Sequence, residues 1–144
     1  MIYATTFKSI NVTPPAAAVN NATVTTPSVD RKGFDYAVIK VMLGATDVGL
    51  TALKLQESDD NSTFTDIPGL DYSVAPATLP TNAQGGKIFA FDVDLRGRKR
   101  YLKPLITVGA GTTGAFITVQ AELHRPEQMP KDATSRGLTA TLSV

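Results

Sequence analysis

The chain contains no cysteine, no tryptophan and a single histidine among its 144 residues. The absence of cysteine excludes disulfide bonds, thiolate zinc sites and a cysteine nucleophile. Fourteen lysines and arginines against 13 acidic residues give a net charge of +1, too small for bulk attraction to nucleic acid or membrane. No apolar run approaches the roughly 20 residues of a membrane span. The first residues also lack the pattern of a signal peptide, so we expect a protein made in the cytoplasm.

What the sequence does contain is a series of short segments with the period of β-strands. Eleven glycines and nine prolines separate them, which argues against long helices. We predict seven to nine strands joined by hairpins and no helix, and antiparallel sheets of this number usually pack as a sandwich. The sequence therefore predicts an all-β antiparallel β-sandwich. The clearest strand segments are 34–43, 51–57, 88–95, 101–108, 115–123 and 138–144.

The chain is long enough for one domain, 1–144, which we divide into three parts. Residues 1–30 are expected to hold an N-terminal strand and a loose arm, 31–124 the core sandwich, and 125–144 a C-terminal arm or strand. Pro104 lies inside the segment 101–108 and cannot donate to a ladder, which predicts a sheet edge or a bulge there.

The segment 34–43 is apolar on both faces. Such a strand is central in its sheet or is covered by a second surface. One face carries alanine, isoleucine, valine and leucine and is the better candidate for the core. The other face makes Phe34, Tyr36 and Met42 candidate contacts with a partner, unless it is simply the other half of the core.

Few residues are candidates for chemistry. His124 ends a strand without a nucleophile-elbow motif, so we interpret it as a partly exposed strand-end residue. Asp92 and Asp94 share one strand face, and an exposed polar face is favoured there over a cation site or paired catalytic carboxylates. The acidic tip 59–61 with Asp66 is interpreted as turn chemistry, with calcium as the alternative. We predict no catalytic, cofactor-binding or metal-binding residue and no enzymatic activity.

Two loops remain. The glycine-rich stretch 109–114 lacks the lysine and the helix of a phosphate-binding loop, so we interpret it as a hairpin turn. The cluster Arg96, Arg98, Lys99 and Arg100 is favoured as a solvated turn, with pairing to an acidic protein surface as the alternative. Nucleic-acid binding would need more basic residues and interleaved aromatic residues.

Two segments together carry a family resemblance. Leu55–Gly69 reads LQESDDNSTFTDIPG, and Phe91–Leu102 reads FDVDLRGRKRYL. In this order they resemble small β-rich structural proteins of tailed bacteriophages, in particular head decoration (cement) or minor capsid proteins. The resemblance spans about residues 34–124. It implies a β-sandwich or jelly-roll-like unit, often trimeric, that sits on the outside of the virion shell without catalysing a reaction.

The resemblance leads to a specific expectation. The chain would be a virion structural protein on the capsid surface that binds the major capsid protein or other virion subunits, as a homo-oligomer with a trimer favoured and without a cofactor. Segments 12–30 and 127–144 would serve as arms for strand addition. The alternative is a carbohydrate-binding or adhesin-like module, although such modules usually present tryptophan or tyrosine platforms and this chain has four tyrosines. A hydrolase using His124 or Asp92 is the third and weakest interpretation.

Overall fold

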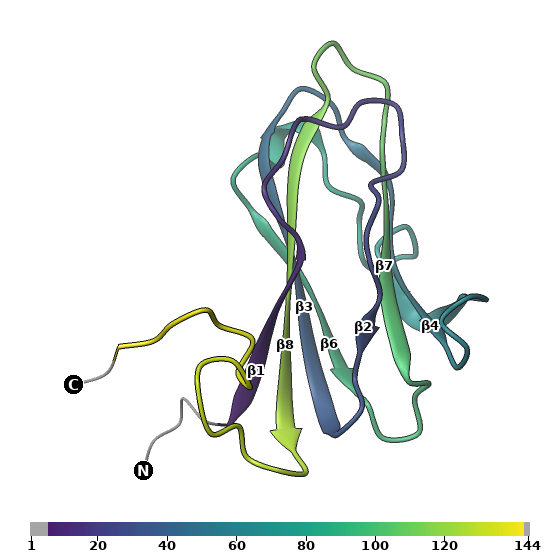
Figure 1. Cartoon of the computed structure of the whole chain (residues 1–144). Helices are drawn as coiled ribbons and strands as arrows, with labels where there is room; N and C mark the ends of the chain where they lie inside the picture. The colour runs from purple at the N-terminus through teal and green to yellow at the C-terminus, as the bar shows by residue number, and fades with distance from the viewer. Residues whose placement is uncertain (1–5, 143–144) are drawn as a thin grey trace.

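The computed structural model describes residues 6–142 and shows two four-stranded antiparallel sheets packed face to face (Figure 1). Sheet A has the strand order β1-β8-β3-β6 and sheet B the order β2-β7-β4-β5. The predicted all-β sandwich is thereby confirmed. The elements are β1 (Phe7–Thr13), β2 (Val29–Asp30), β3 (Phe34–Thr46), β4 (Leu50–Ser58), β5 (Thr65–Asp71), the short 3₁₀ helix η2 (Asn82–Gln84), β6 (Ile88–Asp94), β7 (Tyr101–Val108) and β8 (Ala115–Pro126).

The strand order is that of a jelly roll. Strands pair β1 with β8, β2 with β7, β3 with β6 and β4 with β5, as in one long antiparallel hairpin. Rolling this hairpin places alternate pairs in opposite sheets, and the contacts β3–β8 and β4–β7 complete each sheet. The jelly-roll-like architecture implied by the resemblance is therefore present in the strand order.

Most connections run between the sheets. Among the described strands, only β4 and β5 are consecutive in the chain and neighbours in one sheet. The loops 95–100 and 109–114 each lead from one sheet to the other, so the prediction that hairpins join the strands is wrong for both. Loop length and glycine content are the same for a hairpin and for a short crossing, which is why the sequence did not separate the two.

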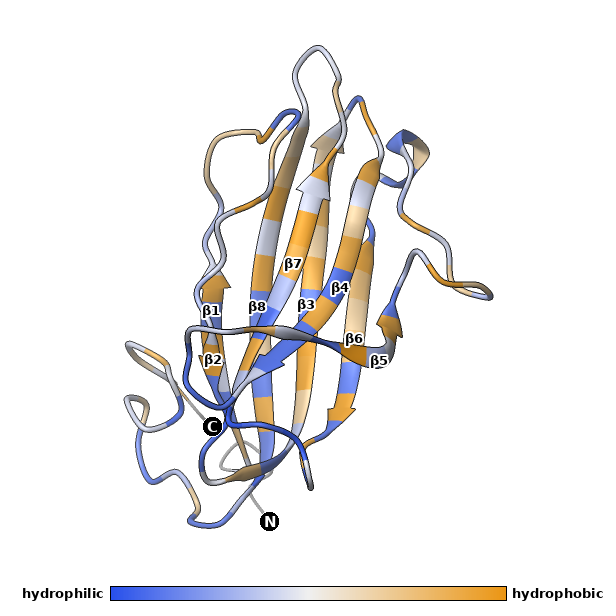
Figure 2. Cartoon of the chain, turned by 90° about the vertical axis from the view of Figure 1, so that its right-hand side faces the viewer, coloured by the Kyte–Doolittle hydropathy of each residue, from blue (hydrophilic) through white to orange (hydrophobic). Residues whose placement is uncertain are grey.

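The core lies between the inward faces of the two sheets, where apolar residues recur at every second position (Figure 2). In β3 the inward face comprises Ala37, Ile39, Val41 and Leu43, all at most 2% exposed. Burying each of the larger side chains contributes roughly 1.5–3 kcal/mol before the entropy cost of ordering. The prediction that 34–43 forms a central strand is confirmed, since β3 lies between β8 and β6.

Pro104 lies in an interior strand, because β7 is placed between β2 and β4. The prediction of a sheet edge or a bulge at Pro104 is therefore wrong, since the register of β7 with β4 shifts only between Leu50 and Ala52. The Pro104 carbonyl accepts a hydrogen bond of 2.7 Å from the Thr26 hydroxyl. In a strand the nitrogen and carbonyl of one residue face the same neighbour, so the Pro104 nitrogen also faces the segment before β2, which pairs with β7 only intermittently. The missing N–H thus removes no bond to β4.

The predicted N-terminal arm is part of the sandwich. After β1 the chain crosses from sheet A to sheet B and reaches β2 (Figure 1). Val12, Val24, Thr26 and Val29 along this path are at most 7% exposed. The prediction of a loose segment over 12–30 is wrong where these residues are buried, whereas residues 14–17 and 20–23 are exposed. The buried residues are spaced irregularly, so the sequence shows no strand period there.

The C-terminal segment also differs from its prediction. β8 extends to Pro126, and the chain then turns back so that the Ser9 N–H donates to the Arg136 carbonyl at 2.8 Å. Residues 138–142 form no strand, so the predicted strand 138–144 is wrong over its described part. Residues 143 and 144 lie outside the described range.

Candidate functional site

The turn between β6 and β7 presents the four predicted cations at one end of the sandwich. The Arg98 N–H donates to the Leu95 carbonyl at 3.0 Å, which closes a β-turn with Gly97 at φ +77°. A positive φ at this turn position favours glycine. Leu95 is fully buried and anchors the turn in the core, so the side chains that follow point to the surface. We refer to residues 94–100, with the groups they contact, as the charged end.

Each of the four cations of the turn between β6 and β7 has a carboxylate partner. Arg100 binds both oxygens of Asp30, at 2.9 and 2.8 Å, in a bidentate pair. These contacts tie the turn to β2, to β6 and to the tip after β4. The four pairs are Arg96–Asp94, Arg98–Glu57 at 3.5 Å, Lys99–Asp59 at 3.9 Å and Arg100–Asp30.

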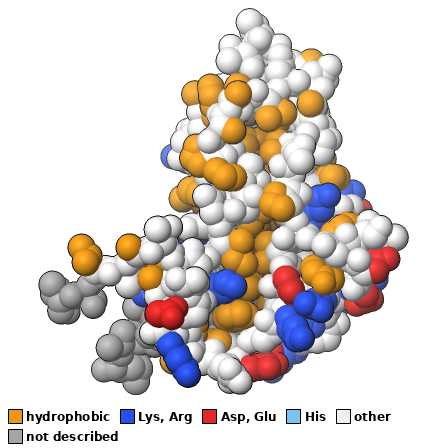
Figure 3. All heavy atoms as spheres, viewed as in Figure 1, with side chains coloured by type: hydrophobic (Ala, Val, Ile, Leu, Met, Phe, Trp, Pro, Cys, Tyr) orange, Lys and Arg blue, Asp and Glu red, His pale blue; other side chains and the backbone are white. Residues whose placement is uncertain are grey.

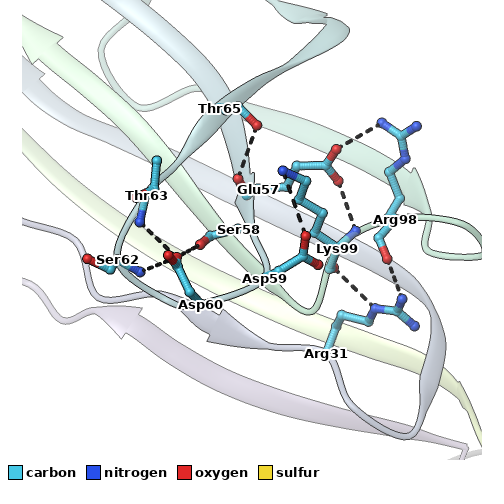
Figure 4. Close-up of polar contacts among 10 residues, drawn as sticks. All are labelled: Arg31, Glu57, Ser58, Asp59, Asp60, Ser62, Thr63, Thr65, Arg98 and Lys99. Atoms are coloured by element: carbon cyan, nitrogen blue, oxygen red, sulfur yellow. Dashed lines mark hydrogen bonds and ion pairs between the residues drawn. The ribbon is translucent and has the colours of Figure 1, made fainter.

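Two further residues hold the turn from inside (Figure 4). The carboxylate of Glu57, whose side chain is 12% exposed, accepts the Lys99 N–H at 3.1 Å. The Arg31 guanidinium donates to the carbonyls of Arg98 and Lys99. Sequence reasoning missed both roles, because the partners lie about 40 and 70 residues away and only the rolled topology brings them together.

The charges of this end nearly cancel. Arg31 and the four turn cations are five positive charges facing the four carboxylates of the ion pairs. Hydrogen bonds from Arg96 hold the pKa of Asp94 well below its usual range, and those from Arg100 lower the pKa of Asp30. Both acids stay ionised at neutral pH, so each neutralises the arginine that it binds.

The acidic tip after β4 is explained by its own turn. Asp60 Oδ1 accepts the Ser58 hydroxyl at 2.7 Å and the N–H groups of Ser62 and Thr63 at 2.9 and 2.8 Å. These bonds lower the pKa of Asp60 to about 2. Asp66 instead binds Lys54 and Gln56 on β4. Within residues 6–142, no three histidine or acidic side chains gather in a way that could hold a metal ion.

A groove of about 620 Å³ lies beside the charged end on the outer face of sheet A. The His124 ring lies between Phe7 and Tyr36, with centroids 5.5 and 6.4 Å away, and its Nε2 is 3.4 Å from a Glu122 carboxylate oxygen. Arg125 has φ +54° and places its guanidinium 5.7 Å from the Tyr36 ring centroid. The groove is lined by Thr6, Tyr36, Val38, His124, Arg125, Pro126 and Met129.

The structure brings most of the predicted contact residues to one end. Phe34 and Tyr36 begin β3, and Tyr36 lies opposite Asp94, so both are near the cationic turn. Met42 lies opposite Ile88, six residues further along β3 and roughly 20 Å away. Phe34 packs partly against the core, whereas Tyr36 opens into the groove. A single contact surface at this end would include the predicted residues except Met42.

Comparison with protein-family models, with curated proteins and with solved structures found no match to this chain. No helix among the described residues is long and apolar enough to cross a membrane.

Proposed function

We propose that this protein is a virion structural protein that binds the assembled capsid of a tailed bacteriophage as a decoration or cement protein. The observation that carries the proposal is the packing of the two segments on which the family resemblance rests. Glu57 of the first segment binds Arg98 and the Lys99 N–H of the second, so the two segments contact each other in the fold. Residues that are far apart in the sequence thus contribute to a single feature of the fold.

The topology supports the proposal by analogy. Eight-stranded jelly rolls recur in viral capsid proteins and in lectins. A fold does not define a function by itself, so the strand order is compatible with both a capsid protein and a lectin and does not decide between them. The sequence resemblance to phage head proteins favours the first of the two classes.

The contact that we propose uses the charged end and the groove beside it. Because the cations are already paired, they contribute a polar rim, and the aromatic and apolar side chains Tyr36, His124 and Met129 supply the buried centre. Met129 is 52% exposed and so has much of its surface left to bury. Partners on the shell would be the major capsid protein or other virion subunits.

Co-sedimentation with empty phage shells tests this function. The wild-type chain is expected to sediment with assembled shells and not with free capsid subunits. Tyr36→Asp is expected to reduce shell binding at least tenfold, because a charge enters the buried centre of the contact. Met42→Asp is the matched control on the same strand face, and the charged-end contact predicts that it binds normally. Equal binding by the wild type and both variants would contradict the proposed contact, and no binding by the wild type would contradict the function.

A carbohydrate-binding module is the second candidate, and the groove favours it. Tyr36 and His124 provide ring faces, and Arg125 and Glu122 provide polar groups at its side. Sugars commonly stack on such rings while hydrogen-bonding to neighbouring polar groups. A glycan array separates the candidates, because specific glycan binding that Tyr36→Ala abolishes, without shell binding, would favour the module.

A further inference from the structure

Arg125, near the end of β8, is an exposed arginine without a carboxylate partner. Within residues 6–142 its guanidinium makes no hydrogen bond or ion pair, and it lies 5.7 Å from the centroid of the Tyr36 ring. The charge of Arg125 also acts on Asp94, but both oxygens of that carboxylate are bound by Arg96. Arg125 therefore differs from the four turn cations, each of which has an acid of its own.

The backbone of Arg125 has a conformation that presents this side chain to the groove. In β8 Leu123 is buried in the core and the His124 ring lies on the outer face, so regular alternation would turn residue 125 inward again. Arg125 instead has φ +54°, which is uncommon for a residue other than glycine, and it precedes a proline, where the backbone is normally extended. Its guanidinium consequently lies on the outer face, against Tyr36. Strained residues of this kind are concentrated at binding sites.

The groove beside Arg125 is lined mainly by aromatic and apolar side chains. The rings of Tyr36 and His124 lie edge to face with centroids 6.4 Å apart, and Met129 forms a wall of the groove. Rings and a thioether are favourable surroundings for an apolar side chain. The Glu122 carboxylate beside the rings is paired with Lys40 at 3.2 Å, so it does not neutralise Arg125.

Positive charge prevails around the end of β8. A second hollow of about 310 Å³ shares Met129 with the groove, and its charged lining residues are Lys8, Lys131 and Asp132. The exposed Asp92 lies on β6, two strands away from β8 and therefore about 10 Å across the sheet. On the face shown in Figure 3, charged side chains gather at this end of the sandwich, whereas the opposite end carries few. A ligand with a carboxylate is favoured at this end of the groove.

We propose that the groove binds an acidic peptide segment of the virion partner, with an apolar side chain between the rings and Met129 and a neighbouring carboxylate on Arg125. The inference rests on the proposed function, because it specifies the chemistry of the shell segment that fills the groove. A planar guanidinium can bind a carboxylate through two parallel hydrogen bonds, which fixes the orientation of the segment. The Tyr36 ring already holds the guanidinium in place, so little side-chain freedom is lost on binding.

Shell binding by charge variants is the first test. Arg125→Asn removes the guanidinium and keeps a residue type that tolerates the left-handed conformation, so we expect an unchanged circular dichroism spectrum. Lys87→Asn is the matched control, because Lys87 is an exposed cation just before β6, at the opposite end of sheet A. Arg125→Asn should weaken shell binding at least tenfold and Lys87→Asn should leave it unchanged. Equal shell binding by the wild type and both variants would overturn the inference and leave the proposed function standing.

A peptide titration tests the groove without any shell. Two blocked peptides, acetyl-Gly-Ser-Phe-Glu-Ser-Gly-amide and its Gln counterpart, differ only in the carboxylate and are added to the nitrogen-15-labelled chain. The Glu peptide should shift the amide signals of Tyr36, His124 and Arg125 and bind at least fivefold more tightly than the Gln peptide. Arg125→Asn should abolish that difference. If Arg125→Asn fails to fold, Arg125→Gly takes its place, since glycine adopts a positive φ without strain.

The outcomes of the titration separate the inference from the function. Equal binding of the two peptides, or no binding of either, would overturn the inference. Signals that shift with glucuronic acid and with neither peptide would also overturn it and would assign the groove to an acidic sugar. A chain that prefers the Glu peptide but ignores shells would contradict the proposed function and support the acidic-peptide specificity of the groove.

Discussion

At the scale of single residues, Glu57 is the carboxylate that holds the charged end together. Its side chain is 12% exposed and binds both a backbone N–H and a guanidinium of the turn between β6 and β7. The neighbouring Asp59 is 75% exposed and reaches Lys99 only at 3.9 Å. The two acids differ in burial and in contact geometry, and we expect their contributions to stability to differ accordingly.

Replacing Glu57 with alanine is expected to lower the free energy of unfolding by about 1–3 kcal/mol, because the Lys99 N–H loses its acceptor in a largely buried position. Asp59→Ala is the control, and it should cost less than about 0.5 kcal/mol, since exposed ion pairs contribute little. Urea denaturation measures both values. Equal costs for the two variants would show that Glu57 is not a structural support.

The lowered pKa of Asp60 predicts how stability depends on pH. The folded-state pKa of Asp60, about 2, lies below its ordinary value of 3.8. The ionised carboxylate therefore contributes its full stabilisation of the folded state above pH 3.8, and this stabilisation is lost as pH falls toward 2. The melting temperature should therefore change little between about pH 7 and 5 and fall steeply below about pH 4. Asp60→Asn, which retains an acceptor oxygen without titrating, should show a shallower acid fall. An identical fall in both proteins would mean that Asp60 makes no contribution.

At the scale of elements, two glycines in the loops between strands distinguish two causes of strain, which are an unfavourable backbone angle and a close contact. Gly114, between β7 and β8, has φ +95°, and a Cβ there would lie 2.1 Å from the Val19 carbonyl oxygen. Gly97 has φ +77° with nothing within 4 Å of its Cβ position. The two positions therefore share the unfavourable backbone angle and differ only in the close contact.

Gly97→Ala is expected to cost about 1–2 kcal/mol from the backbone angle alone. Gly114→Ala should cost about 1–3 kcal/mol more, because the added methyl group also forces the Val19 backbone away. Thermal denaturation of the two variants measures the difference. If Gly97→Ala lowers the stability as much as Gly114→Ala, the close contact between Gly114 and Val19 is not the reason that position 114 requires glycine.

The sequence predicted the long strands well and the irregular elements poorly. β3, β4, β6, β7 and β8 each alternate over seven or more residues, and their predicted ranges agree with the structure to within three residues. β2 has two residues and β5 contains Pro68 and Gly69, so neither shows a clear period. Segment 138–142 alternates yet forms no strand. Alternation shows that a segment can pair as a strand, but it does not show that a neighbouring strand is present.

At the scale of the whole molecule, the sequence indicated a sandwich but not its order. A jelly roll and a meander of hairpins use the same alternating strands, and the difference lies in which strands pair across 40 or more residues. The same long-range pairing creates the charged end, where β2, the tip after β4 and the turn after β6 meet. The cationic turn was therefore visible in the sequence, whereas its neutralisation by Asp30 and Glu57 was not.

Binding to an assembled phage shell is the most direct measurement of the proposed function. The purified chain is mixed with empty shells that lack it and is separated by sedimentation, with free capsid subunits as the control. The proposal predicts saturable binding to shells and none to free subunits, with binding at least tenfold weaker in Tyr36→Asp and unchanged in Met42→Asp. A wild-type chain that stays in the supernatant with intact shells, while correctly folded by circular dichroism, would contradict a decoration function.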